Sequence, residues 1–296
     1  MARFGEVLTA MVTPFHDDLS VDYDGAVTLA KWLVEHGNDG LVVTGTTGEA
    51  STLTDEEQVD VWRAVREAVD VPLIAGSGTN DTRHAAHLTS QAVEAGMNAV
   101  LIVSPYYNRP SQAGIEMHFR EVAAATDLPV MLYDIPIRTG RKISNEVMWR
   151  LVEEVPNIWA VKDALGNPSE SARLVAEAPD GFELYSGDDS FTLPLLAVGA
   201  VGVIGVATHW AGREMGEMIA AFTKGDLQLA RELNARLIES YDFETGDANP
   251  NPLPAKAMLR MLGLPAGQCR LPLGVAPDGL EARAADVWRN LGHDDV

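Results

Sequence analysis

The sequence predicts an α/β protein built as a (β/α)8 TIM barrel with a C-terminal helical extension, and two patterns support that fold class. Short apolar runs rich in β-branched residues recur eight times, at intervals of roughly 20 to 32 residues, the length of one strand-and-helix unit. The stretches between the runs carry apolar residues at three- and four-residue spacing, the period of a helix. An open doubly wound sheet usually has fewer strands in two halves, so eight alternating units favour the barrel.

The apolar runs are the eight expected strands. They span residues 7–12, 40–43, 72–75, 99–103, 129–133, 158–161, 183–185 and 201–206. Helix-start signals stand between them: Thr54 precedes three acidic residues, and Ser111 and Ser144 precede helical patterns. The segments Asn80-Asp81-Thr82 and Pro168-Ser169 mark two further helix starts.

After the eighth run the pattern is helical only. Helical periodicity covers residues 214–223, 227–241, 254–262 and 280–291. The prolines of Asn249-Pro250-Asn251-Pro252 withdraw amide donors and favour an extended entry into the following helix. We therefore expect a barrel with the active site over residues 1–225 and a C-terminal helical region over residues 226–296.

Composition narrows the classes of partner. Asp and Glu total 43 against 22 Lys and Arg, a formal net charge of −21 that repels nucleic acid. The single cysteine, Cys269, cannot form a disulfide within its chain, and the N-terminal stretch lacks the pattern of a signal peptide. No apolar run approaches the ~18 residues of a membrane span. We expect a cytoplasmic protein that contacts neither nucleic acid nor membrane.

Candidate site residues follow the expected strands, because the active site of such a barrel lies at the carboxyl ends of its strands. The segments found there are Thr13-Pro14, Thr44-Gly45-Thr46-Thr47-Gly48-Glu49, Gly76-Ser77-Gly78, Ser104-Pro105-Tyr106-Tyr107, Tyr133-Asp134, Lys162-Asp163, Ser186-Gly187-Asp188-Asp189 and Val206-Ala207-Thr208. Most of these segments carry hydroxyl groups. One of them, at Lys162, carries an amine.

Lys162 ends an otherwise apolar run. Burial there disfavours the ammonium form, lowers the lysine pKa and leaves a neutral amine that can attack a carbonyl and form a Schiff base. Position alone leaves an alternative open, in which the side chain extends to the barrel rim and pairs with Asp163, Asp188 or Asp189.

Three neighbouring features fit the same chemistry. Tyr133 ends the preceding strand, where its phenol can transfer a proton; the alternative is core packing with the hydroxyl bound to a carbonyl. The loop Gly45-Thr46-Thr47-Gly48-Glu49 offers closely spaced amides and two hydroxyls for a small carboxylate. Arg138, in a turn-prone segment above the barrel mouth, can clamp a carboxylate with two hydrogen bonds or form a surface ion pair.

The sequence gives no support for a metal or a bound cofactor. His84 and His87 form only an i,i+3 pair, and no cluster of Cys and His has the spacing of a metal site. The glycine-rich segments match neither a Walker A motif nor a dinucleotide-binding fingerprint. We expect neither a metal nor a cofactor.

Taken together, four motifs resemble those of the dihydrodipicolinate synthase and N-acetylneuraminate lyase family of pyruvate-dependent Schiff-base aldolases. They are Gly45-Thr46-Thr47-Gly48-Glu49, Tyr106-Tyr107-Asn108-Arg109-Pro110, Tyr133-Asp134-Ile135-Pro136-Ile137-Arg138-Thr139-Gly140 and Lys162-Asp163-Ala164, in the order and spacing of that family. The double threonine, the arginine and Asn251-Pro252-Leu253-Pro254 are similar to the synthase branch. A departure is Asp134, where many synthases have Asn.

The resemblance implies a condensation of pyruvate with L-aspartate 4-semialdehyde to 4-hydroxy-tetrahydrodipicolinate, in lysine and diaminopimelate biosynthesis. It implies that Lys162 forms the imine and that Tyr133, Thr46 and Tyr107 relay protons. It further implies substrate contacts for Thr47, Arg138, Gly187 and the backbone carbonyl of Ile204.

The resemblance also implies a homo-oligomer, a tetramer built as a dimer of dimers, because Tyr107 of such enzymes reaches into a neighbouring subunit's site. Lysine-sensitive members bind lysine in a cleft between subunits, where Asn80 and Tyr106 match. His84 stands at their glutamate position, and Asp55 and Gln58 stand at their histidine positions, which implies weak inhibition. Two other functions stay open: an aldolase for a 2-keto-3-deoxy sugar acid, and a barrel that binds a ligand without catalysis.

Overall fold

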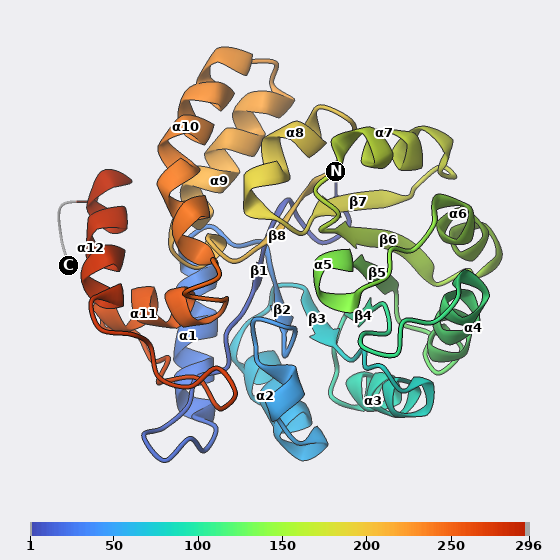
Figure 1. The fold of residues 1–296 in the computed structure, drawn as a ribbon, viewed down its shortest axis with the longest axis horizontal. Coiled ribbons are helices and arrows are strands. Elements are labelled where there is room, and N and C mark those ends of the chain that lie inside the picture. Colours follow the sequence, from blue (N-terminus) through green and yellow to red (C-terminus); the bar gives the residue numbers. More distant parts are fainter. Residues whose placement is uncertain (1, 294–296) are drawn as a thin grey trace.

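The computed structural model describes residues 2–293, which form a closed barrel of eight parallel strands in chain order (Figure 1). The strands are β1 (Val7–Ala10), β2 (Gly40–Val43), β3 (Leu73–Gly76), β4 (Ala99–Val103), β5 (Val130–Asp134), β6 (Ile158–Asp163), β7 (Glu183–Ser186) and β8 (Gly202–Gly205). Each pairs with the next, and β1 closes the barrel on β8, with Leu8 opposite Ile204. The predicted fold class and all eight strands are confirmed.

The strands separate two apolar cores. Inside the barrel lie alternate strand residues such as Leu8, Ile74 and Ile204. Between strands and helices lies the second core, which includes Leu41 and Trp62. A strand buried on both faces has no polar face to show, which is why the sequence shows continuous apolar runs and not alternation.

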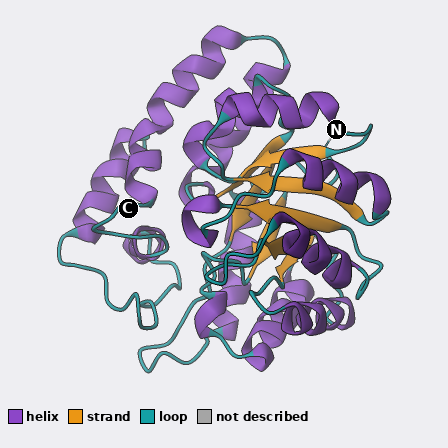
Figure 2. Ribbon diagram, turned by 45° about the vertical axis from the view of Figure 1, so that its right-hand side comes forward, coloured by secondary structure: helices purple, strands orange, loops and turns teal. Residues whose placement is uncertain are grey.

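Helices cover the outside of the strands in an outer layer (Figure 2). They are α1 (Tyr23–Glu35), α2 (Asp55–Ala68), α3 (Thr82–Glu94), α4 (Gln112–Ala123), α6 (Asn145–Glu154), α7 (Pro168–Glu177), α8 (Thr192–Leu196) and α9 (Thr208–Thr223). Thr54 caps α2 in a reciprocal capping box with Glu57, and Ser111 and Ser144 cap α4 and α6. The side chains expected to start helices therefore accept the first free amides.

Three short helices were not expected from the periodicity. They are α5 (Pro136–Thr139) and two 3-10 turns, η1 (Ala50–Thr52) and η2 (Asp189–Phe191). Arg138, expected in a turn-prone segment, lies on the single helical turn α5. A single turn is too short to show a 3.6-residue period in the sequence.

Three helices follow the barrel and gather on one side of it, in orange to red at the left of Figure 1. They are α10 (Leu227–Glu244), α11 (Leu253–Met261) and α12 (Leu280–Asn290), close to the expected ranges. The indole of Trp210, on α9, donates to Ser240 on α10 at 3.0 Å. Glu244, at the end of α10, accepts from the Ala207 amide just after β8, and Asn251, just before α11, donates to Thr47. The end of α10 and the start of α11 therefore lie against the barrel mouth.

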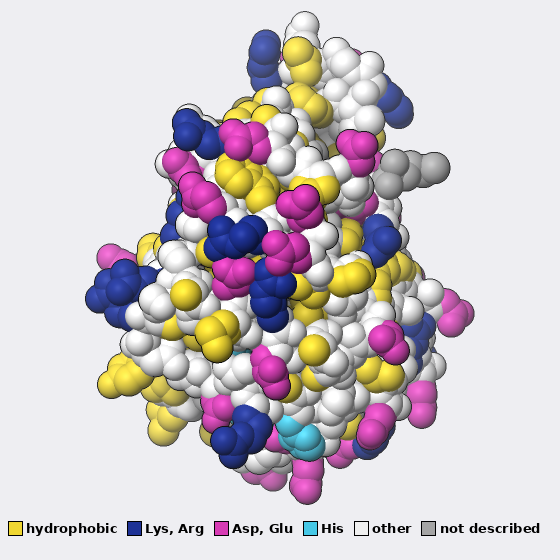
Figure 3. All heavy atoms as spheres, turned by 90° about the vertical axis from the view of Figure 1, so that its right-hand side faces the viewer, with side chains coloured by type: hydrophobic (Ala, Val, Ile, Leu, Met, Phe, Trp, Pro, Cys, Tyr) yellow, Lys and Arg dark blue, Asp and Glu magenta, His cyan; other side chains and the backbone are white. Residues whose placement is uncertain are grey.

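Acidic and basic side chains are intermingled on the surface, as Figure 3 shows for the face formed by α3, α4 and α6. Part of this pattern is an ion-pair network in which Glu116 meets Arg120 at 2.8 Å and Arg150 at 2.6 Å. Within residues 2–293, none of the helices has the length and apolar character needed to cross a membrane.

Candidate active site

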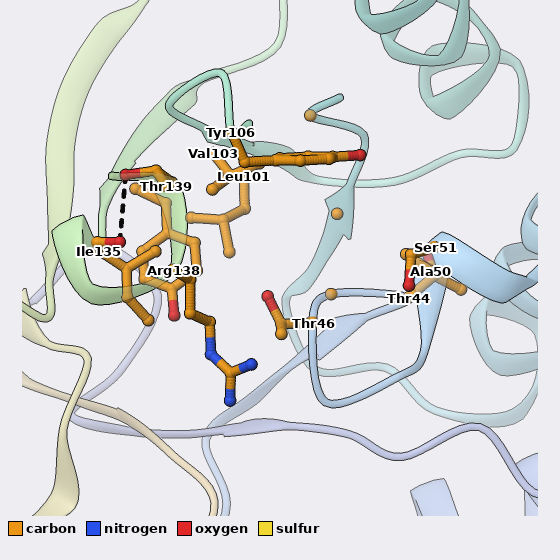
Figure 4. Close-up of a pocket in the computed structure, with 14 residues that line it drawn as sticks. Thr44, Thr46, Ala50, Ser51, Leu101, Val103, Tyr106, Ile135, Arg138 and Thr139 are labelled. Carbon is orange, nitrogen blue, oxygen red and sulfur yellow. Dashed lines mark hydrogen bonds between the residues drawn. The ribbon is translucent and has the colours of Figure 1, made fainter. Parts of the chain in front are cut away.

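A cavity of about 260 Å³ opens at the carboxyl ends of β2 to β5. Its lining combines hydroxyl groups, glycine backbone and apolar side chains: Thr44, Gly45, Thr46, Ala50, Ser51, Gly76, Gly78, Leu101, Val103, Tyr106, Tyr133, Ile135, Arg138 and Thr139. Figure 4 shows Thr46 and the Arg138 guanidinium extending toward the same space below the ring of Tyr106. The cavity has the size and polarity of a site for small carboxylates.

Tyr133 lines this cavity, and Lys162 lies beside it on the next strand without itself lining the cavity. They are paired in register on β6 and β5, and the Lys162 Nζ lies 4.6 Å from the centre of the Tyr133 ring. Lys162 is 5% exposed. Burial lowers its pKa to about 8, against the opposing charges of Asp189 and Glu244. A larger fraction of this amine is therefore neutral near pH 7 than of an ordinary lysine, and the neutral form is the one that attacks a carbonyl.

The barrel leaves room for the lysine at Gly187. A Cβ at that position would lie 2.9 Å from the Lys162 Cγ and 3.1 Å from its Cε, so any side chain there would displace the amine.

The sequence left Asp163, Asp188 and Asp189 open as partners of Lys162. Asp163 points away, because it accepts from the Leu165 amide at 2.8 Å and from the Ser171 hydroxyl at 2.5 Å. Asp189 is the one whose charge acts on Lys162.

The Tyr133 phenol is kept in its neutral form by burial, which raises its pKa above the ordinary value. The charge of Arg138, and to a smaller extent the nearby Thr46 hydroxyl, lower the phenol pKa against this effect of burial. The phenol can thus give or take a proton without bringing a lasting charge into the cavity.

The loop between β2 and α2 is held from several sides. Thr44 and Glu49 have left-handed backbone φ angles of 54° and 56°. Trp62 Nε1 donates to the Thr44 hydroxyl at 2.7 Å, and the Thr13 hydroxyl donates to the Gly48 carbonyl at 2.7 Å. Thr46 lines the cavity, whereas the Thr47 hydroxyl is buried and accepts a hydrogen bond from a side chain of the C-terminal region.

The C-terminal region supplies that partner and anchors the loop. Asn251 Nδ2 donates to Thr47 Oγ1 at 2.9 Å. Lys256 on α11 forms an ion pair with Glu49 at 2.6 Å, with both side chains at most 1% exposed. The Arg270 amide donates to the other Glu49 oxygen at 2.9 Å. The conformation of this loop thus depends on residues more than 200 positions away.

The remaining predicted residues lie in different surroundings. Arg138 is exposed at the cavity mouth. Ile204, on β8, is fully buried inside the barrel. Tyr107 is 90% exposed and does not line the cavity of its own chain, whereas its neighbour Tyr106 does. The prediction that Tyr107 serves a neighbouring subunit is not tested by a single chain.

Sequence reasoning missed several residues at the site. Ser51 and Thr139 line the cavity, although they lie beyond the ends of the strands that we searched. Glu244, at the end of α10, acts on Lys162 across the barrel mouth, and no local motif in a helical pattern marks it.

Asp134 lies on the outer face of β5 and not beside Lys162. Its Oδ1 accepts from the Ile143 amide at 3.2 Å, and burial raises its pKa to about 7. A carboxyl group that is partly protonated at neutral pH fits this site, which explains how the chain tolerates an acid there.

No group of three or more His, Cys, Asp or Glu side chains in the described part of the chain could hold a metal ion. Cys269 is buried, and burial raises the pKa of its thiol to about 12, as expected of a packed thiol.

Comparison with known proteins gives one consistent result. The family model described as "Dihydrodipicolinate synthetase family" matches residues 3–285. The 4-hydroxy-tetrahydrodipicolinate synthase of Moorella thermoacetica is 50% identical over 98% of this chain and 99% of its own, and that of Acidothermus cellulolyticus is 52% identical over 92% and 87%. A dihydrodipicolinate synthase structure from Bacillus anthracis superposes with a TM-score of 0.93 at 43% identity, covering 98% of this chain and 99% of its own.

The fold and these comparisons define a lyase of the class I, pyruvate-dependent aldolase type, built on a (β/α)8 barrel. The chain belongs to the dihydrodipicolinate synthetase family.

Proposed function

We propose that this enzyme condenses pyruvate with L-aspartate 4-semialdehyde to 4-hydroxy-tetrahydrodipicolinate, a step of lysine and diaminopimelate biosynthesis. The observation that carries the proposal is the buried Lys162 amine against the Tyr133 phenol at the carboxyl end of the barrel. The names of its relatives, 4-hydroxy-tetrahydrodipicolinate synthase, support the choice of substrates.

The reaction begins when the neutral Lys162 amine attacks the ketone carbon of pyruvate. Loss of one water gives a cationic imine, and loss of a methyl proton gives an enamine. The enamine carbon then attacks the aldehyde of the second substrate, whose oxygen takes a proton. The semialdehyde amino group finally attacks the imine carbon, which closes the ring and releases Lys162. The sum is two substrates in, one cyclic product and one water out.

Each side chain has a proposed role. Tyr133 moves the protons, in a relay with Thr46, which lines the same cavity. Tyr107 of a neighbouring subunit completes that relay. Thr46 and Thr47 hold the pyruvate carboxylate, and Arg138 at the mouth binds the carboxylate of the semialdehyde through its planar guanidinium.

Gly187 and Ile204 shape the base of the pocket. Gly187 does so by leaving room for the Lys162 side chain. The Ile204 carbonyl, at the end of β8, gives an acceptor near the reacting centre. No external cofactor enters this scheme.

A comparison of aldehydes tests the substrate assignment. With saturating pyruvate, the enzyme should show a much higher kcat/KM for L-aspartate 4-semialdehyde than for sugar aldehydes such as D-glyceraldehyde. A preference for the sugar aldehyde would assign the chain to the 2-keto-3-deoxy sugar acid aldolases. The absence of turnover with any aldehyde would favour a barrel that binds ligands without catalysis.

We propose further that the working form is a homotetramer, a dimer of dimers, in the cytoplasm. Tyr107 and Ile137 support an interface beside the cavity mouth, since each is 90% exposed and such apolar side chains mark contact surfaces. Mixing inactive Tyr107→Phe chains with inactive Lys162→Ala chains should restore part of the activity, because one class of mixed site regains both groups. No recovery after verified subunit exchange would rule out a shared site.

We also propose that the chain divides at residues 225 and 226, between α9 and α10. The barrel then carries the reacting groups, and the C-terminal helical region carries the residues that hold the loop at Thr47 and Glu49.

A further inference from the structure

Two buried carboxyl groups from distant parts of the chain meet near Lys162. Asp189 begins η2, separated from the end of β7 by two residues, and Glu244 is the last residue of α10. Asp189 is 1% exposed and Glu244 is 7% exposed. Neither residue has a role in the reaction as described above. Two acidic groups buried together need an explanation, because burial of two negative charges is costly.

Each carboxyl group has a fixed backbone partner at the end of β8. Asp189 Oδ2 accepts from the Val206 amide at 2.8 Å, and Glu244 Oε2 accepts from the Ala207 amide at 3.0 Å. Asp189 Oδ1 is different, because no N–H or hydroxyl group of the described residues donates to it. The chain nevertheless makes room for this oxygen, since a Cβ on Gly205 would lie only 2.3 Å from it.

Because the amides of the adjacent residues Val206 and Ala207 hold the two carboxyls, Glu244 is the neighbouring acid for the unpartnered Asp189 oxygen. Two ionised carboxylates are acceptors only, so a hydrogen bond between them requires one proton. Burial raises the pKa of both groups, and the charge of Asp189 raises that of Glu244 further. Two carboxyls that share one proton carry one negative charge in total.

The surrounding charges are of both signs. Asp188 adds negative charge beside the pair, and Tyr241 on α10 is kept neutral by burial and by these acids. Both acids act on the Lys162 amine, whose pKa they raise against the effect of burial and of Arg138.

We propose that Asp189 and Glu244 share a single proton and hold one negative charge beside the Lys162 amine, as positioning residues for Schiff-base formation. The inference rests on the proposed function, since it assumes that Lys162 forms the imine. One charge stabilises the cationic imine that forms from neutral groups in a buried site. Two charges would hold the amine protonated and prevent its attack.

Isosteric variants distinguish an Asp189–Glu244 pair that carries one negative charge from a pair that carries two. Asp189→Asn and Glu244→Gln each replace one carboxyl with an amide that can donate to the other, so each single variant keeps one carboxylate. The double variant keeps none. Asp188→Asn is the matched control, because it removes a neighbouring carboxylate that is not among the groups acting on Lys162.

The readout is the pH dependence of borohydride trapping of pyruvate on the intact enzyme. The midpoint of its rise with pH should stay in place in both single variants and in Asp188→Asn. It should fall by about one pH unit or more in the double variant, because loss of the last negative charge lowers the Lys162 pKa. A shift in either single variant as large as that of the double, or no shift in the double, would overturn the proposal.

A second measurement needs no substrate and no double variant. At neutral pH, the infrared difference between wild type and each single variant should show the loss of one protonated carboxyl C=O band. The Asp188→Asn difference should lack it. If neither single variant loses such a band, the two acids do not share a proton. Failure of pyruvate to label the wild type would contradict the proposed function instead, whatever the infrared result.

Discussion

Tyr133 and Lys162 hold paired positions on adjacent strands, and the lysine Nζ lies 4.6 Å from the centre of the phenol ring. The strand pairing fixes both backbones, so the separation of phenol and amine is set by the barrel and not by a flexible loop. Groups held in this way can react without a further loss of orientational freedom.

Replacing Tyr133 with Phe should keep the fold, because the buried ring remains. Turnover should fall by the ~10²–10⁴ typical of a lost acid–base group. The measurement is kcat at saturating substrates, with the melting temperature as the control for folding. A rate equal to that of wild type would show that the phenol only packs.

Replacing Arg138 with Lys tests the grip on the second substrate. An ammonium keeps the charge but lacks the planar pair of donors, so the KM for the semialdehyde should rise much more than the KM for pyruvate. Since Arg138 is exposed at the mouth, the melting temperature should hardly change. Equal increases for both substrates would assign the arginine to the general structure of the pocket.

The barrel could be predicted because its signals are local. Buried parallel strands give continuous apolar runs, and capping side chains such as Thr54 stand next to the amides that they satisfy. Lys162 and Tyr133 could be found for a related reason, since both follow such runs directly. The segment that carries Arg138 was expected to turn, but its helical character could not be predicted because four residues cannot show a period.

Contacts made by barrel closure could not be predicted from the sequence. Glu49 and Lys256 form their ion pair although 207 positions separate them in the sequence, and Asp189 and Glu244 lie together although 55 positions separate them. No local sequence pattern near any of these residues indicates its partner. Tyr107 illustrates another limit, because its expected role depends on a second chain.

The buried pair of Lys256 and Glu49 gives a stability prediction. Lys256→Met leaves the Glu49 carboxylate buried without its cation and should cost about 3–5 kcal/mol in the free energy of unfolding. Lys31→Met, at an exposed position on α1, is the matched control and should change it by no more than ~0.5 kcal/mol. Chemical denaturation measures both. A loss below about 1 kcal/mol for Lys256→Met would show that the pair does not anchor the loop.

Lysine should inhibit this enzyme weakly or not at all. The family resemblance implies that His84 replaces a glutamate of the lysine-sensitive members, and the His84 Nε2 lies 2.8 Å from Asp55 Oδ1. Asp55 is thus already paired with the imidazole, which leaves its carboxylate a weaker partner for an incoming ammonium group. The lost charge-assisted contact should weaken lysine binding by roughly 10- to 150-fold. Titration of lysine at neutral pH checks this, and half-inhibition at submillimolar lysine would refute it.

Borohydride trapping with pyruvate tests the central claim, that Lys162 forms the Schiff base. Mass spectrometry should find one reduced pyruvate adduct on Lys162 and none on other lysines, and Lys31→Ala should label as wild type does. Labelling should increase as the pH rises through about 8, because the protonated amine below that pKa cannot attack the ketone. An adduct on another lysine, or labelling that survives Lys162→Ala, would contradict the account.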